Sequence, residues 1–138
     1  MKTLTVGKLA QRAGIGIETV RFYERKGLIK EPPRNESGYR QYPEDVVSRI
    51  LFIRRAKELG FTLKEIDELL SLKVDPESTC ADVRERAEAK IADIDQRLGI
   101  LRRMKNALQT LVIKCNSESQ TDDCPILEAL EEGENYGG

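Results

Sequence analysis

One segment of 35 residues, 80–114, contains no proline and a single glycine, Gly99, so a long continuous helix is the structure it favours. Apolar side chains recur along it at spacings of three and four residues, and charged residues fill the other positions. The apolar positions are Val83, Ala87, Ile91, Ile94, Leu98, Leu101, Met104, Leu108 and Leu111. A narrow apolar seam of this length is typical of a coiled coil, so we expect a homodimer. The alternative is a helix that packs on its own domain.

The two halves of the chain differ in charge, although the whole chain has a net charge of −1. Residues 1–73 hold 15 Lys and Arg against 10 Asp and Glu, and residues 74–138 hold 8 against 14. A basic half is typical of a protein that meets a polyanion, which predicts two parts with different tasks. The chain has no run of 18 uncharged apolar residues and no signal-peptide core at its start. We therefore expect a cytoplasmic protein that has no membrane-spanning segment.

The basic half begins with a helix-turn-helix pattern. The first helix is expected over 6–13 after the cap Thr5, and the second over 17–26, with the glycine-rich turn 14–16 between them. On the second helix, Arg21 and Arg25 share one face by their spacing. This face is a candidate surface for reading DNA.

A small hairpin, here called the wing and comprising residues 34–42, is predicted next. The prolines at 32–33 exclude a helix, 34–38 has the composition of a turn, and 39–42 alternates like a strand. Two outward arginines of the wing, Arg34 and Arg40, are expected to lie along a phosphate backbone or to enter a minor groove.

Two more helices complete the basic half. One is expected to open at 43–45 and to stop at Gly60, and the other to start after the cap Thr62 and to cover 63–72. The domain is predicted to close near Lys73.

Three cysteines bracket the long helix. Cys80 stands at its start, Cys115 follows its end, and Cys124 comes nine residues later. Because a helix rises ~1.5 Å per residue, Cys80 and Cys115 of one chain are roughly 50 Å apart and cannot share an ion. If two long helices pair antiparallel, Cys80 of one subunit meets Cys115 and Cys124 of the other, which gives two three-thiolate sites. The alternatives are small buried thiols, or a disulfide between Cys115 and Cys124.

These features predict a mainly α protein in three parts. They are a winged helix-turn-helix DNA-binding domain over 1–73, an antiparallel coiled-coil dimerisation helix with its connector over 74–114, and a metal-binding loop, short helix and tail over 115–138. The short helix is expected over 126–130. An enzyme that uses a reactive thiol is not expected, because the chain has no His to assist it.

Several motifs match one family of regulators. They are TVGKLA at 5–10, ETVRFYE at 18–24 with KGL at 26–28, GYRQY at 38–42 and LGFTLKEI at 59–66. With these motifs, over nearly its whole length, the chain resembles the MerR family of bacterial metal-responsive transcriptional regulators. The resemblance implies a homodimer on double-stranded promoter DNA, which we expect to be contacted by Thr19, Arg21, Tyr23, Arg34, Tyr39 and Arg40.

The resemblance also implies a mechanism and a ligand set. Regulators of this family are expected to activate by distorting promoters whose −35 and −10 elements stand too far apart for RNA polymerase. The cysteine placement resembles that of the mercury, lead, cadmium and zinc branches, which implies that Cys80, Cys115 and Cys124 are the metal ligands.

The donor set narrows the choice of metal. A site built from thiolates without imidazole favours soft ions, and three sulfurs suit Hg(II) or Pb(II). Zn(II), and often Cd(II), would need a fourth donor, such as Glu118, Asp122, Asp123 or water. Zinc sensors of the family commonly carry a cysteine pair and a loop His, which are lacking here, and Cys80 speaks against a copper(I) sensor. We expect Hg(II) as the effector, with Zn(II), Cd(II) and Pb(II) as alternatives. A metal-independent DNA-binding protein with structural cysteines is the alternative of another class.

Overall fold

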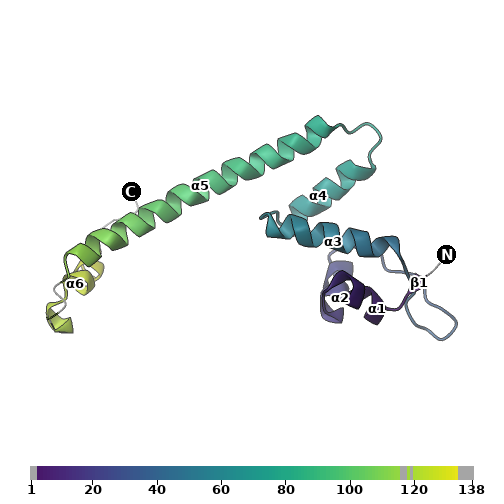
Figure 1. The fold of residues 1–138 in the computed structure, drawn as a ribbon, viewed down its shortest axis with the longest axis horizontal. Coiled ribbons are helices and arrows are strands. Elements are labelled where there is room, and N and C mark those ends of the chain that lie inside the picture. Colours follow the sequence, from purple (N-terminus) through teal and green to yellow (C-terminus); the bar gives the residue numbers. More distant parts are fainter. Residues whose placement is uncertain (1–2, 116–117, 119, 134–138) are drawn as a thin grey trace. The chain divides into compact units, whose positions relative to one another are not determined.

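The computed structural model describes residues 3–115, 118 and 120–133 (Figure 1). The chain forms two compact units, residues 1–86 and 87–138. Its elements are β1 (Thr3–Leu4), α1 (Val6–Ala13), α2 (Ile17–Arg25), β2 (Tyr42–Pro43), α3 (Asp45–Glu58), α4 (Leu63–Val74), α5 (Cys80–Ile113), the 3-10 helix η1 (Thr121–Asp123) and α6 (Pro125–Glu131). The predicted mainly α class is confirmed, and each predicted helix lies within two residues of its observed bounds. The three-part domain division stays a prediction.

Side-chain caps fix where two of the helices in the first unit begin. Thr5 Oγ1 accepts a hydrogen bond from the Lys8 backbone N–H at 3.2 Å at the start of α1. Thr62 and Glu65 form a reciprocal capping box at the start of α4, with bonds of 3.2 and 2.8 Å. Each such cap contributes about 1 kcal/mol, and both threonines were predicted as caps.

The core of the first unit holds the helix-turn-helix. Helix α1 packs against α2 and α3, and α3 packs against α4. Fully buried side chains come from all four helices and from the segments between them, among them Leu9, Val20, Leu28, Tyr42, Ile50, Ile53 and Ile66. Because α1, α2 and α3 share one core, the outer face of α2 is held in a fixed orientation.

The turn between α1 and α2 depends on Gly14, which adopts a left-handed φ of +71°. A Cβ atom there would lie 2.8 Å from Nη1 of Arg54. The same Nη1 donates a 2.7 Å hydrogen bond to the Ala13 carbonyl. The glycine therefore allows both the tight turn and the tie from α3 to the end of α1.

The wing is held at its base by a two-stranded sheet that includes the start of the chain. Strands β1 and β2 are antiparallel, with Leu4 opposite Tyr42. Within the wing, Arg34 and Arg40 form one isolated antiparallel bridge. The side chain of Asn35 closes the turn by accepting the backbone N–H groups of Ser37 and Tyr39, both at 3.0 Å. The predicted hairpin is thus present as a turn with one bridge, and its regular pairing is with β1, which the sequence did not predict.

The second unit contains most of α5, followed by η1 and α6. Leu111 of α5 and Ala129 of α6 are buried there, with 2% and 6% of their surface exposed. Pro125 occupies the first turn of α6, where its missing N–H costs nothing. Residues 116, 117 and 119, in the predicted metal-binding loop after Cys115, lie outside the described residues. No helix in the described part of the chain is long and apolar enough to cross a bilayer.

Candidate DNA-binding and metal-binding sites

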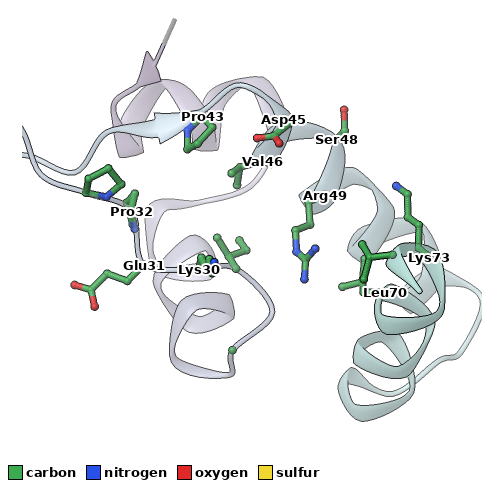
Figure 2. Close-up of a pocket in the computed structure, with 14 residues that line it drawn as sticks. Lys30, Glu31, Pro32, Pro43, Asp45, Val46, Ser48, Arg49, Leu70 and Lys73 are labelled. Atoms are coloured by element: carbon green, nitrogen blue, oxygen red, sulfur yellow. The ribbon is translucent and has the colours of Figure 1, made fainter. Parts of the chain in front are cut away.

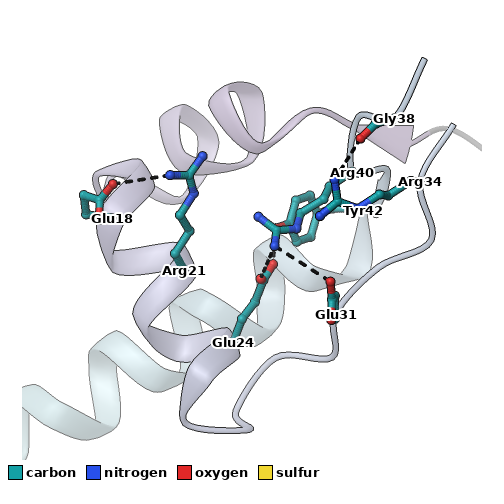
Figure 3. A network of polar contacts seen from close by, with 8 residues as sticks. All are labelled: Glu18, Arg21, Glu24, Glu31, Arg34, Gly38, Arg40 and Tyr42. Carbon is teal, nitrogen blue, oxygen red and sulfur yellow. Dashed lines mark hydrogen bonds and ion pairs between the residues drawn. The ribbon is translucent and has the colours of Figure 1, made fainter.

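The outer face of α2 is exposed and basic. The Arg21 side chain is half exposed, and its Nη1 lies 3.5 Å from Oε1 of Glu18 (Figure 3). One turn later, the Arg25 guanidinium and the Lys26 ammonium lie 6.0 and 5.7 Å from the centre of the Phe22 ring. These contacts hold three cations along α2 and the residue that follows it, which suits a surface that meets phosphates and base edges.

Two predicted DNA contacts on α2 are less accessible than Arg21. Thr19 is half-buried, whereas Tyr23 is 3% exposed and belongs to the core. Burial raises the pKa of Tyr23, and the nearby positive charge of Arg54 partly opposes the rise. Tyr23 follows buried Val20 by three residues, so both lie on the inward side of the helix. We therefore leave Tyr23 out of the proposed DNA-contacting surface.

The wing presents Arg34 and Tyr39 outward. Tyr39 is 68% exposed, and Nη1 of exposed Arg34 donates a 3.0 Å hydrogen bond to the Gly38 carbonyl. Arg40 is directed toward α2 instead, where its Nη2 lies 3.8 Å from Oε2 of Glu24 (Figure 3). Both arginines of the wing were predicted to point outward, which fits Arg34 but not Arg40, whose side chain is only 25% exposed.

Glu24 is the site residue that the sequence reasoning missed. Its side chain is only 8% exposed. The signal was its spacing, because Glu24 follows buried Val20 by four residues and so shares the inward side of α2. An acidic side chain at such a position needs partners from another element.

A hollow of about 760 Å³ lies in the first unit. It is bordered by the segment 27–33, the start of α3 and the end of α4 (Figure 2). Arg49 reaches into this region, and its Nε donates a 2.6 Å hydrogen bond to the Leu28 carbonyl. The lining contains none of the residues predicted to bind DNA or metal.

The three thiols are free. Cys80 and Cys115 are exposed and Cys124 is half-buried. The arrangement therefore contains neither a disulfide between Cys115 and Cys124 nor fully buried thiols. Among the described residues of one chain, no three His, Cys, Asp or Glu side chains gather closely enough to hold a metal ion.

The cysteines stand near the two ends of α5. Cys80 is its first residue, Cys115 follows its last residue by two, and Cys124 caps the start of α6. The 34 residues of α5 correspond to ~51 Å at the usual rise per residue. A site with all three thiolates therefore needs a second chain.

The predicted apolar seam of α5 is largely uncovered. Between 40% and 59% of the surface is exposed at Val83, Ile91, Ile94, Leu98, Leu101, Met104 and Leu108. Leu111, by contrast, is buried within its own unit. Such a row of large apolar side chains marks an interaction surface.

Two family models match the chain and together decide its family. The model described as "MerR HTH family regulatory protein" matches residues 4–73, and "MerR, DNA binding" matches residues 47–111. The chain belongs to the MerR family. The MerR family consists of regulatory proteins, so this protein is a transcriptional regulator and not an enzyme.

Close relatives within the MerR family cover nearly the whole chain. The mercuric resistance operon regulatory protein of Bacillus cereus is 43% identical over 125 residues, which are 91% of this chain and 95% of that protein. The HTH-type transcriptional regulator CueR of Escherichia coli is 37% identical, with 92% and 93% covered.

A solved structure of the MerR family is similar over nearly its full length. The transcription regulator PbrR691 from Ralstonia metallidurans CH34, in complex with lead(II), matches with a TM-score of 0.83 and 37% identity. The match covers 92% of this chain and 98% of that one. The similarity therefore includes the long helix and the segment after it, where two of the three cysteines lie.

Proposed function

We propose that this protein is a cytoplasmic, metal-responsive regulator that binds promoter DNA as a homodimer and senses a thiophilic ion, Hg(II) in the first place. The observation that carries the proposal is the placement of three free cysteines at the two ends of a long helix with an exposed apolar seam. Relatives named as mercuric resistance operon regulators, at 37–43% identity, support the choice of metal.

The homodimer follows from the seam of α5. Burial of apolar side chains is worth ~25 cal/mol per Å², and a second copy of α5 offers a matching seam. Antiparallel pairing about a two-fold axis places the start of one helix beside the end of the other. This arrangement brings Cys80 of one subunit to Cys115 and Cys124 of the partner subunit, once at each end of the dimer.

The donor set fits a soft ion. Three thiolates complete a trigonal site for Hg(II) without any oxygen ligand. Pb(II) is the second candidate, because the similar PbrR691 structure is a complex with lead(II). Zn(II) or Cd(II) would need a fourth ligand, and the segment between Cys115 and Cys124 offers the exposed carboxylates of Glu118, Asp122 and Asp123.

On DNA, we assign base and phosphate contacts to the outer face of α2 and phosphate contacts to the outer side of the wing. Arg21 with Thr19 would face the major groove, and Arg34 with Tyr39 would lie along the backbone. Two such domains, joined through α5, can hold both halves of a two-fold operator.

Regulation would act through the shape of the promoter. Each base pair turns the helix by ~34°, so two surplus pairs between the promoter elements misalign them by about 70° for RNA polymerase. Bending and untwisting that corrects this costs about 1–6 kcal/mol, which the two domains must supply through their contacts. Coordination by thiolates from both subunits can favour the activating arrangement on that scale.

Transcription in vitro tests the proposal and its choice of metal. Purified protein, RNA polymerase and the cognate promoter would be titrated with Hg(II), Pb(II), Zn(II) and Cd(II), while absorption reports the sulfur-to-metal bands. We expect activation by Hg(II), with the same response in Asp122→Ala and in the control Glu128→Ala. Activation by Zn(II) or Cd(II) that is lost in Asp122→Ala would overturn the choice of Hg(II). Transcription indifferent to all four ions would refute metal sensing.

A further inference from the structure

The carboxylate of Glu24 is buried at the junction between α2 and the wing. Removing a charged carboxylate from water is costly unless ion pairs and hydrogen bonds replace its solvation. Both oxygens of Glu24 have partners from the last residues of the wing. The Tyr42 hydroxyl donates a hydrogen bond to Oε1, and Nη2 of Arg40 lies 3.8 Å from Oε2 (Figure 3).

The hydrogen bond from Tyr42 to Glu24 is stable because the Tyr42 side chain is buried and keeps its proton. Its side chain has no exposed surface, so its hydroxyl depends on Glu24 for an acceptor. Burial, the hydrogen bond to Glu24 and the negative charge of Glu24 all raise the pKa of Tyr42 well above its ordinary value. The hydroxyl therefore keeps its proton, and the donor, at every pH at which the protein works.

Arg40 supplies the second tie. Only 25% of its side chain is exposed, and its Nη2 is also 3.8 Å from Oε1 of Glu31, in the segment before the wing. Its Nε is buried and makes no hydrogen bond within the part of the chain that the structure describes. A guanidinium placed between two carboxylates would leave Glu24 without a countercharge if it turned out to a phosphate.

We propose that Glu24, Arg40 and Tyr42 form a clamp that fixes the wing relative to α2, and that Arg40 affects DNA binding as a positioning residue of this clamp. The inference rests on the proposed function as a DNA-binding regulator. A duplex presents its groove and its backbone at fixed spacing, so the helix that reads bases and the wing that meets phosphates must keep one relative position. Arg34 and Tyr39, on the outer side of the wing, then make the contacts that Arg40 positions.

The salt dependence of DNA affinity distinguishes an arginine that contacts a phosphate from an arginine that positions the wing. The assay would use the full chain and a duplex selected in vitro for binding by the wild type, with Kd measured over a series of salt concentrations. Each phosphate contact contributes about 0.9 to the slope of log Kd against log salt. We expect Arg34→Gln to lower this slope by about 0.9. Arg40→Gln should weaken binding by about three- to tenfold, the scale of one lost hydrogen bond, and leave the slope unchanged.

A second substitution that restores DNA affinity would show that the loss in Arg40→Gln does not come from general misfolding. In Glu24→Gln/Arg40→Gln the two amides can pair without charge, so affinity should return to within about twofold of the wild type. Thermal unfolding followed by circular dichroism would verify that each variant is folded. A slope lowered by about 0.9 in Arg40→Gln, with no rescue in the double variant, would overturn the clamp and make Arg40 a phosphate ligand. A wild-type chain that selects no duplex would instead refute the proposed function.

Discussion

Replacing Leu101 with alanine should weaken the proposed homodimer by about 30- to 150-fold. Leu101 lies in the middle of the seam and is 59% exposed in the single chain. Full burial of a leucine side chain is worth ~1.5–3 kcal/mol, so covering the exposed part contributes about 1–1.5 kcal/mol beyond what alanine retains. A symmetric dimer loses this twice, about 2–3 kcal/mol, and ~1.4 kcal/mol corresponds to a factor of ten.

Sedimentation equilibrium over a dilution series would give the dissociation constant of each variant. The matched control is Gln96→Ala, because five residues place Gln96 about 140° around the helix from Leu101, and alanine suits a helix well. This control should leave the constant within about twofold of the wild type. Equal constants for Leu101→Ala and the wild type, with both chains folded, would refute the seam as the dimer interface.

Three further outcomes follow from the first unit. Gly14→Ala should lower the free energy of unfolding in urea by about 1–2 kcal/mol, because Gly14 has a left-handed φ. Gly7→Ala, inside α1, should instead raise this free energy by ~0.5–1 kcal/mol. Equal effects of the two substitutions would contradict the argument. The free energy of unfolding should fall above about pH 10 by up to ~1.4 kcal/mol per pH unit. Tyr42 ionises there in the unfolded chain but keeps its proton in the folded protein, where its pKa is raised. An equally steep fall in Tyr42→Phe would argue against this account. Arg21→Ala should lose ~1–3 kcal/mol of preference between the selected duplex and base-substituted duplexes in gel shifts, and an unchanged preference would remove Arg21 from base contact.

The helices were predictable because local signals agree with the packing. Thr5 and Thr62 are side-chain caps at the positions where the sequence placed them, and Gly14 ends α1 in the left-handed conformation. Strand β1 was missed because its two residues are too few to show an alternating pattern. Its existence depends on pairing with Tyr42, a partner 38 residues away from Leu4.

The sequence predicted which residue types form the candidate sites, but not the directions in which their side chains point. Arg34 and Arg40 were both predicted to point outward from the wing, and only the fold directs Arg40 toward Glu24. Tyr23 is of a residue type that can contact DNA, yet its position on the inward side of α2 places it in the core. The positions of the cysteines at the two ends of α5 could be predicted from their spacing in the sequence. The length of α5 keeps these two ends apart within one chain, so the fold of a single chain does not assemble the site.

Mixed dimers test most directly whether the metal site is shared between subunits. A Cys80→Ser chain and a Cys115→Ser/Cys124→Ser chain each form homodimers with no complete set of three thiolates. In their heterodimer, one end combines Cys80 of the double variant with Cys115 and Cys124 of the single variant. Purified heterodimers should therefore bind one Hg(II) tightly, at half the wild-type stoichiometry and with the sulfur-to-metal absorption of the wild type. A three-sulfur absorption band that fails to return in verified heterodimers, or that persists in either variant homodimer, would contradict a site built from both chains.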